Sequence, residues 1–136
     1  MKLSPSDRQQ IEDLYKRYCY AIDSLDVAAW VDCFTPDGLF VPSFGAVRGE
    51  FRGQAELAEF ASNTNRHQVS RHWNANLLID DTTDPISASC YALLIDYAGT
   101  APRLLAHVVY YDKLAQYDGG WRFIERRPRH DSARSE

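Results

Sequence analysis

The sequence predicts an α+β fold, in which a curved antiparallel sheet wraps around a long N-terminal helix, with two shorter helices, as a cone-shaped α+β barrel enclosing a cavity. Two observations predict it. Near the start of the chain apolar residues recur every three or four positions, as on one face of a helix, whereas alternating or apolar runs fill the second half, as in strands. Helices gathered against one face of an antiparallel sheet define this class. At 136 residues the chain is one domain, which we assign to 1–128, with 129–136 as a disordered tail.

The N-terminal helix carries the first candidate functional residue. Ser4 suits the cap position, Pro5 the first helical position and Asp7 the first turn. A stripe of apolar residues then predicts a helix to about Leu25, with the members Ile11, Leu14, Tyr15, Tyr18, Ile22 and Leu25. Asp23 lies beside this stripe, at an angle from which its carboxylate would reach the edge of a pocket or face solvent.

Shorter elements separate this helix from the strands. Asp26 suits the cap of a second, short helix that carries Trp30. Thr35-Pro36-Asp37-Gly38 has the composition of a turn. The other predicted elements are a short strand at 39–41, a hairpin or pocket-covering loop at 43–53, and a third helix at 54–63.

Four long strands are predicted in the second half of the chain, at 67–80, 86–97, 104–117 and 121–127. The second and third are apolar on both faces, so we expect them in the centre of the sheet. Along the first, alternation places Val69, Trp73 and Leu77 on one face. His72 falls on the other face among polar residues, which by itself is typical of a solvent-facing position.

Composition and local patterns exclude several classes of partner. The net charge is -4, and no basic run is long enough to follow a nucleic-acid backbone. The N-terminus lacks a signal-peptide pattern, and no apolar stretch approaches the roughly 20 residues of a membrane span. The three cysteines lack CxxC spacing, which predicts reduced thiols in a cytoplasmic protein. The one basic cluster is expected to be a solvated terminus and consists of Arg126, Arg127 and Arg129.

Four stretches of the chain resemble the SnoaL-like branch of the nuclear-transport-factor-2-like superfamily, which includes polyketide cyclases, scytalone dehydratase and a bile-acid dehydratase. The stretches are IEDLYKRYCYAIDSLDVAAWVDCFTPDGLF, GQAELAEF, RHWNANLLID and YYDKLAQYDGGWRFIERR. The resemblance implies the cone-shaped fold. It is a weaker guide to function, because this fold hosts enzymes, binding modules and non-catalytic subunits.

The resemblance also implies an active site. In enzymes of this branch an aspartate near the end of the first helix and a histidine on the first long strand form a dyad in the cavity. Asp23 and His72 stand at the matching positions. Tyr18 matches a tyrosine that some dehydratases of the group use, although its place in the apolar stripe fits core packing equally well.

Four further residues are candidates for substrate binding. Asp96 and Arg126 lie near positions where some members of the branch place polar site residues, and His107 lies where scytalone dehydratase uses a second histidine. Trp30 on the second helix is the fourth. The residues alone indicate other roles, namely a turn-proximal carboxylate for Asp96, a surface or interface cation for Arg126 and a core histidine for His107.

The proposed dyad suits proton transfer. A histidine supplies a base near neutral pH, a carboxylate on its far nitrogen fixes the tautomer, and a tyrosine hydroxyl stabilises a developing enolate or leaving group. We therefore expect a cofactor-independent dehydratase, isomerase or cyclase that acts on a hydrophobic, oxygenated small molecule. No metal is expected, because His67 and His72 would face opposite sides of one strand.

Two other functions remain open, and so does the assembly. The chain could be a non-catalytic small-molecule-binding protein, or an accessory subunit such as the small subunit of a dioxygenase. This fold usually pairs through the outer face of its sheet, so the resemblance implies a homodimer or homotrimer. Trp73, Val69 and Leu77 would suit the buried interface.

Overall fold

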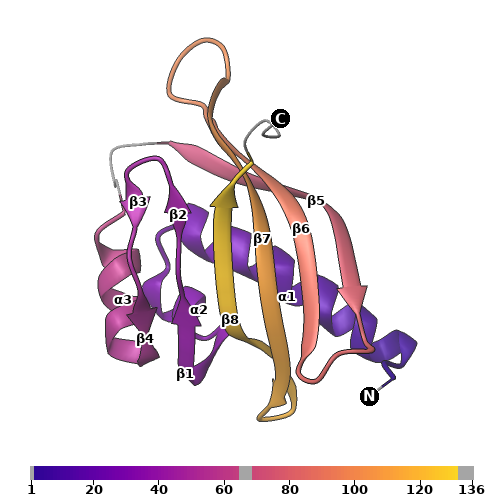
Figure 1. Ribbon diagram of the computed structural model, residues 1–136. Coiled ribbons are helices and arrows are strands. Elements are labelled where there is room, and N and C mark those ends of the chain that lie inside the picture. Colours follow the sequence, from indigo (N-terminus) through magenta and orange to yellow (C-terminus); the bar gives the residue numbers. More distant parts are fainter. Residues whose placement is uncertain (1, 65–68, 132–136) are drawn as a thin grey trace, which may run out of the picture.

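The computed structural model describes residues 2–64 and 69–131, and its architecture confirms the predicted α+β class (Figure 1). A curved, unclosed sheet lies against the long helix α1, which runs across one face of the strands β8, β7 and β6 (Figure 1). The strand order is β3-β2-β8-β7-β6-β5, and β1 pairs with β4 and β8. The two shorter helices and the short strands gather at one side of the sheet, where they cover the end of α1 (Figure 1).

The elements follow the predicted order. The helices are α1 (Pro5–Asp23), α2 (Val27–Val31) and α3 (Gly53–Ser62). The short strands are β1 (Phe34–Phe40), β2 (Ser43–Phe44), β3 (Val47–Arg48) and β4 (Phe51–Arg52). The long strands are β5 (Ser70–Asp80), β6 (Ile86–Asp96), β7 (Arg103–Tyr117) and β8 (Gly120–His130). Within the described residues, no helix combines the length and apolar character that crossing a membrane requires.

Helix α1 is held at both ends by polar contacts. Ser4 and Asp7 form a reciprocal capping box, in which each side chain accepts a hydrogen bond from the other residue's backbone N–H. The helix ends at Asp23, two residues before the predicted end, because Leu25 has a φ of 58° and cannot continue it. Asp26 then caps α2 by accepting a hydrogen bond from the backbone of Ala29.

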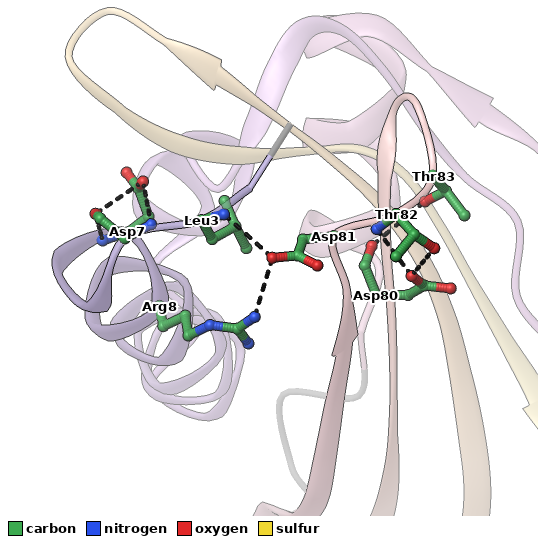
Figure 2. A network of polar contacts seen from close by, with 8 residues as sticks. Leu3, Asp7, Arg8, Asp80, Asp81, Thr82 and Thr83 are labelled. Atoms are coloured by element: carbon green, nitrogen blue, oxygen red, sulfur yellow. Dashed lines mark hydrogen bonds and ion pairs between the residues drawn. The ribbon is translucent and has the colours of Figure 1, made fainter.

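One carboxylate ties the N-terminus to the turn between β5 and β6 (Figure 2). Asp81 Oδ2 accepts hydrogen bonds from the backbone N–H of Leu3 and from Arg8 Nη2, both at 3.1 Å. Beside it, Asp80 accepts bonds from the hydroxyl and the backbone of Thr82, which shape the turn. These contacts fix where the long helix begins on the sheet, and therefore where Asp23 lies at its other end.

The predicted turn at 35–38 lies inside β1 instead. Phe34 pairs with Phe123 of β8, but Leu39 pairs with Glu125, so five positions of β1 span two positions of β8. The four intervening residues form a wide irregularity in a strand that is otherwise continuous. The turn-forming composition of this stretch therefore produces a bulge, because both flanks remain paired with the same neighbouring strand.

An irregularity in β5 reverses the direction of its side chains. Asn76 has a φ of 58°, and the pairing with β6 shifts between Ala75 and Leu78. Trp73 before the bulge is exposed, whereas Leu77 after it is half-buried. The prediction that these two residues share a face is therefore wrong. His72 is half-buried on the side covered by α1, so its sequence-based interpretation as solvent-facing is also wrong.

Strand β8 continues through His130, three residues beyond its predicted end. His130 pairs with Val108 of β7, and Arg129 pairs with Ser43 of β2, so this segment is held on both sides. Residues 129 and 130 therefore belong to the sheet and not to the predicted tail. Asp131 follows the strand, and residues 132–136 of that tail, like His67 on the predicted first strand, lie outside the described residues.

Candidate functional site

Asp23 and His72 come together where the end of α1 meets the first residues of β5. The carboxylate Oδ1 of Asp23 lies 2.6 Å from Nδ1 of the His72 ring. The same carboxylate accepts the backbone N–H of His72, at 3.1 Å and 3.2 Å from its two oxygens. The two side chains therefore lie within the hydrogen-bonding distance that the resemblance implied.

This arrangement determines which ring nitrogen of His72 is free. A carboxylate at this distance accepts a hydrogen bond from Nδ1–H, which leaves Nε2 with its lone pair available. The additional bonds to the backbone hold the carboxylate in place independently of the ring. The Asp23 side chain is 9% exposed and that of His72 is 21% exposed, so the pair is shielded but still accessible.

A cavity of about 380 Å³ opens beside the dyad. Its walls are mainly apolar and come from α1, the β2–β3 hairpin, α3 and the sheet, with Ile22, Leu25, Phe40, Phe44, Val47, Phe51, Phe60 and Leu94. Its polar lining includes Asp23, His72, Tyr18, Tyr110 and Glu59. The prediction of a hairpin or covering loop at 43–53 is confirmed, since Phe44, Val47 and Phe51 lie along this wall.

Tyr18 belongs to both the cavity wall and the aromatic core. Its ring lies 5.6 Å from that of Trp30 and 6.1 Å from that of Tyr110, measured between centroids. Burial raises the pKa of Tyr18 well above its ordinary value, so the hydroxyl remains protonated and can donate a hydrogen bond. Both interpretations of this residue from the sequence are therefore compatible with its position.

Arg126 is buried, not exposed as its place in a basic cluster indicated. Its side chain is 0% exposed, and Nε donates a hydrogen bond to Asp112 Oδ1 at 3.0 Å. The cause is a bulge in β8, where Lys113 pairs with Glu125 but Leu114 pairs with Phe123. The extra residue reverses the alternation and turns Arg126 inward. It is not among the residues that line the cavity beside the dyad.

The other three candidates for substrate binding also lie away from the cavity lining, namely Trp30, Asp96 and His107. Trp30 is fully buried among aromatic rings, 5.0 Å from Phe34 and 5.6 Å from Phe60 between centroids. Asp96 accepts hydrogen bonds from the backbone of Ala98 and from Arg103, as the turn-proximal interpretation predicted.

His107 is half-exposed, so its interpretation as a core histidine is wrong. Its ring centroid lies 5.3 Å from that of His130, and its Nδ1 lies 3.9 Å from Asp131 Oδ2. It borders a different surface hollow, which shares Phe44, Val47 and Leu94 with the cavity but contains neither residue of the dyad. In the sequence, both faces of β7 are apolar. The pattern therefore does not indicate that one of the two faces is exposed.

Sequence reasoning did not single out Tyr110 or Glu59 as site residues. Tyr110 is buried on β7 and lines the cavity next to Tyr18, with the two ring centroids 6.1 Å apart. Its period-two spacing from Val108 and Asp112, which are also buried, is the signal that places it on the inner face. Among the described residues, no three His, Cys, Asp or Glu side chains converge as metal ligands would.

Comparison with known proteins identifies the family. The SnoaL-like domain model matches residues 4–127, so the chain belongs to the SnoaL-like domain family. The chain has no significant match among curated proteins. Its fold is shared by many solved structures.

Three solved structures illustrate this similarity. A protein of unknown function from Mycobacterium tuberculosis, Rv3472, is 29% identical with a TM-score of 0.82, covering 98% of this chain and 79% of its own. ActVI-ORFA from Streptomyces coelicolor is 21% identical with a TM-score of 0.80, covering 91% of this chain and 96% of its own. A putative scytalone dehydratase from Novosphingobium aromaticivorans is 18% identical with a TM-score of 0.77, covering 93% and 85%. At these identities the last two establish the fold alone.

Proposed function

We propose that the protein is a cofactor-independent general acid/base enzyme of the dehydratase, isomerase or cyclase type, in which His72 is the base and Asp23 its partner. The observation that carries the proposal is the 2.6 Å contact between Asp23 and His72 Nδ1 at the edge of a mainly apolar cavity. Membership of the SnoaL-like family supports it.

The free Nε2 of His72 removes a proton from a carbon next to a carbonyl group. The electron pair of the broken C–H bond moves into the enolate, and Asp23 stabilises the imidazolium that forms. Tyr18 donates a hydrogen bond to the enolate oxygen or to a leaving hydroxyl. The imidazolium then returns its proton to a leaving hydroxyl, to another carbon or to an alkoxide, which gives elimination, isomerisation or ring closure respectively.

The cavity lining defines the class of substrate. Aromatic and aliphatic walls over about 380 Å³ suit a hydrophobic ring system of small-molecule size. The polar lining consists of the dyad, the two tyrosines, Glu59, Asn63, Thr64 and Ser70. We therefore propose a cyclic ketone or hydroxyketone as the substrate, with its carbonyl directed at the polar end of the cavity.

A panel of cyclic hydroxyketones, with mass spectrometry and chromatography, tests the proposal. The expected result is loss of water from at least one compound, or conversion to an isomer of equal mass. Asp23→Asn and His72→Gln should each reduce that turnover by about 10²–10⁴-fold. Tyr20→Phe is the matched control, because Tyr20 lies on the same helix but is 79% exposed and does not line the cavity.

Equal turnover in the wild type and in correctly folded Asp23→Asn and His72→Gln variants would contradict the proposal. Tight binding of panel compounds without turnover would instead favour the second function, a small-molecule-binding protein. Thermal unfolding of each variant separates loss of chemistry from loss of fold.

A further inference from the structure

A buried ion pair lies behind the two tyrosines of the cavity. Asp112 on β7 and Arg126 on β8 are both 0% exposed, and Arg126 Nε donates to Asp112 Oδ1 at 3.0 Å. Tyr15 of α1 donates its hydroxyl proton to the other carboxylate oxygen at 2.5 Å. Removing two charges from water is costly, so an ion pair in this position calls for a role beyond packing.

The guanidinium group is stacked among aromatic rings that reach the cavity. Arg126 Cζ lies 3.7 Å from the ring centroid of Tyr110 and 4.2 Å from that of Tyr18. Both tyrosines line the cavity beside the dyad. Arg126 Nη1 is buried and, within the described residues, has no hydrogen-bond acceptor. The positive charge of the pair thus lies against both cavity tyrosines, and it also lies 4.8 Å from the ring centroid of Tyr15.

The negative end of the pair contacts the hydroxyl of Tyr15. Burial raises the pKa of Tyr15, and the effect of Asp112 in the same direction is stronger than the opposing effect of Arg126. For Tyr18 the order is reversed, because Arg126 lowers the pKa more strongly than Asp112 raises it, although burial dominates. Asp112 therefore acts more strongly than Arg126 on the pKa of Tyr15, and Arg126 acts more strongly than Asp112 on the pKa of Tyr18.

Tyr110 is the second tyrosine of the cavity wall. The residue is 4% exposed and lines the cavity, and its hydroxyl has no hydrogen bond to any other described residue. Burial raises the pKa of Tyr110 well above its ordinary value, so it remains a protonated donor. Tyr18 and Tyr110 thus present two phenolic donors with one guanidinium behind them.

We propose that Tyr18 and Tyr110, polarised by the buried Arg126, form a two-donor site for a ligand oxygen that carries negative charge. This inference rests on the proposed function and narrows its substrates to enolisable ketones and phenols. In the reaction the proton moves from carbon to His72 Nε2 and the electron pair ends on the ligand oxygen. The two hydroxyls donate hydrogen bonds to that oxygen and keep their protons. Arg126 touches no ligand atom and is a positioning residue.

The probe 2-naphthol tests the inference without a known substrate. Its neutral and ionised forms differ in absorbance, so the pH at which it ionises can be measured both free and protein-bound. Hydrogen bonds to a charged oxygen favour ionisation, and the bound probe should therefore ionise about one pH unit lower than the free probe. Tyr110→Phe and Tyr18→Phe should each remove at least half of that shift.

Tyr111→Phe is the matched control. Tyr111 is the next residue on β7, but its side chain is exposed on the opposite face of the sheet, so its loss should leave the shift unchanged. Arg126→Met should also reduce the shift. If that variant does not fold, the Tyr110→Phe result decides the question, because it removes a single oxygen from a folded core.

The outcomes separate this inference from the proposed function. If 2-naphthol binds but ionises at the same or a higher pH than in solution, the two-donor site is wrong while the dyad is unaffected. If the probe binds and the Tyr110→Phe variant shows the full shift, the role of Tyr110 is wrong. If 2-naphthol does not bind in the cavity, the two-donor site is wrong, while turnover of the hydroxyketone panel still decides the role of the dyad.

Discussion

Asp23 holds His72 by its backbone as well as by its ring. The carboxylate spans the N–H and Nδ1 of the same residue, so the position of the strand and the tautomer of the ring depend on one side chain. This double contact explains how a residue near the edge strand of the sheet can keep a fixed ring orientation. It also means that Asp23 has a structural role that a catalytic test must separate.

The tautomer of His72 is directly measurable. We expect nitrogen NMR to show the neutral ring protonated at Nδ1, because the Asp23 carboxylate accepts that proton. In Asp23→Asn the preference should weaken and signals of the Nε2-protonated form should appear. A wild-type ring that is protonated mainly at Nε2 would rule out Nε2 as the base.

Trp30 acts through packing. It is 0% exposed and contacts the rings of Tyr18, Phe34, Phe40 and Phe60. We expect Trp30→Ala to lower the free energy of unfolding by about 3–5 kcal/mol, measured by denaturant titration. Ala28→Gly on the exposed side of α2 is a control for helix stability alone, with an expected cost of about 1 kcal/mol. An effect of Trp30→Ala no larger than this control would contradict the account.

The directions of some side chains can be predicted from the sequence, and those of others cannot. The difference depends on whether the helix or strand that carries the residue is regular. The helical period correctly places Tyr18 in the apolar stripe and Asp23 at its margin, since α1 is regular. The directions of Leu77 and Arg126 depend on bulges at Asn76 in β5 and near Ile124 in β8. His72 precedes the bulge in β5, and its burial is missed because alternation alone does not tell which face of the strand α1 covers. A bulge reverses the direction of every later side chain in the strand, and neither bulge contains a glycine that would indicate it in the sequence.

The capping box of α1 couples the helix to the sheet. Asp7 accepts hydrogen bonds from the backbone and hydroxyl of Ser4 and from Trp121 Nε1 on β8. The Ser4 backbone bond, followed by the Ser4 hydroxyl and Trp121, lowers the pKa of Asp7 below its ordinary value. The ionised carboxylate is therefore favoured in the folded state.

This shift gives a stability that depends on pH. A lowered folded-state pKa stabilises the protein above the unfolded value of about 4, and the gain is lost as the pH falls below it. We expect Asp7→Asn to lower the melting temperature at pH 7 and to have little effect near pH 3. Glu12→Gln, an exposed carboxylate on the same helix, should change neither value. An equal decrease in melting temperature at both pH values would show that the charge of Asp7 does not contribute to stability.

The start of a helix can be predicted where local capping residues determine it. Ser4, Pro5 and Asp7 mark the start of α1, and Asp26 marks that of α2, because capping is a local interaction. The path of β1 is not predictable in this way. Its composition at 35–38 favours a turn, and only the pairing of both flanks with β8, far along the chain, keeps it a strand.

The outer face of the sheet carries most of the large apolar side chains that are exposed among the described residues. Its exposed side chains come from neighbouring strands and include Trp73, Leu78, Tyr91, Leu93, Leu104 and Tyr111. Leu77, expected in this interface from the sequence, points inward, and Leu78 takes its place because of the β5 bulge. We propose that a second copy of the chain covers this face, since apolar patches across several strands are typical of homodimer interfaces.

Light scattering coupled to size-exclusion chromatography tests this assembly. We expect a dimer or trimer for the wild type, and a shift toward monomer for Leu93→Asp on the central strand β6. Tyr20→Asp is the control, because Tyr20 is also a large exposed side chain but lies on α1 and not on the sheet. A wild-type monomer at every concentration would contradict the proposal.

The fold class is predictable because several independent signals agree. The period of α1, the alternation of the long strands and the segregation of helices from strands all indicate an α+β layout. The cavity is less predictable, since its walls join residues from α1, α3, the β2–β3 hairpin and β7. The ion pair between Asp112 and Arg126 depends on the same long-range assembly.

The central claim is that His72 acts as a base in this cavity. The most direct test is proton exchange at the carbon next to the carbonyl of 2-tetralone, followed by proton NMR in heavy water. The account predicts that the wild-type protein accelerates deuterium incorporation above the buffer rate, and that His72→Gln removes the acceleration while retaining the fold. Exchange at the buffer rate in the wild type, or equal acceleration by the folded His72→Gln variant, would contradict it.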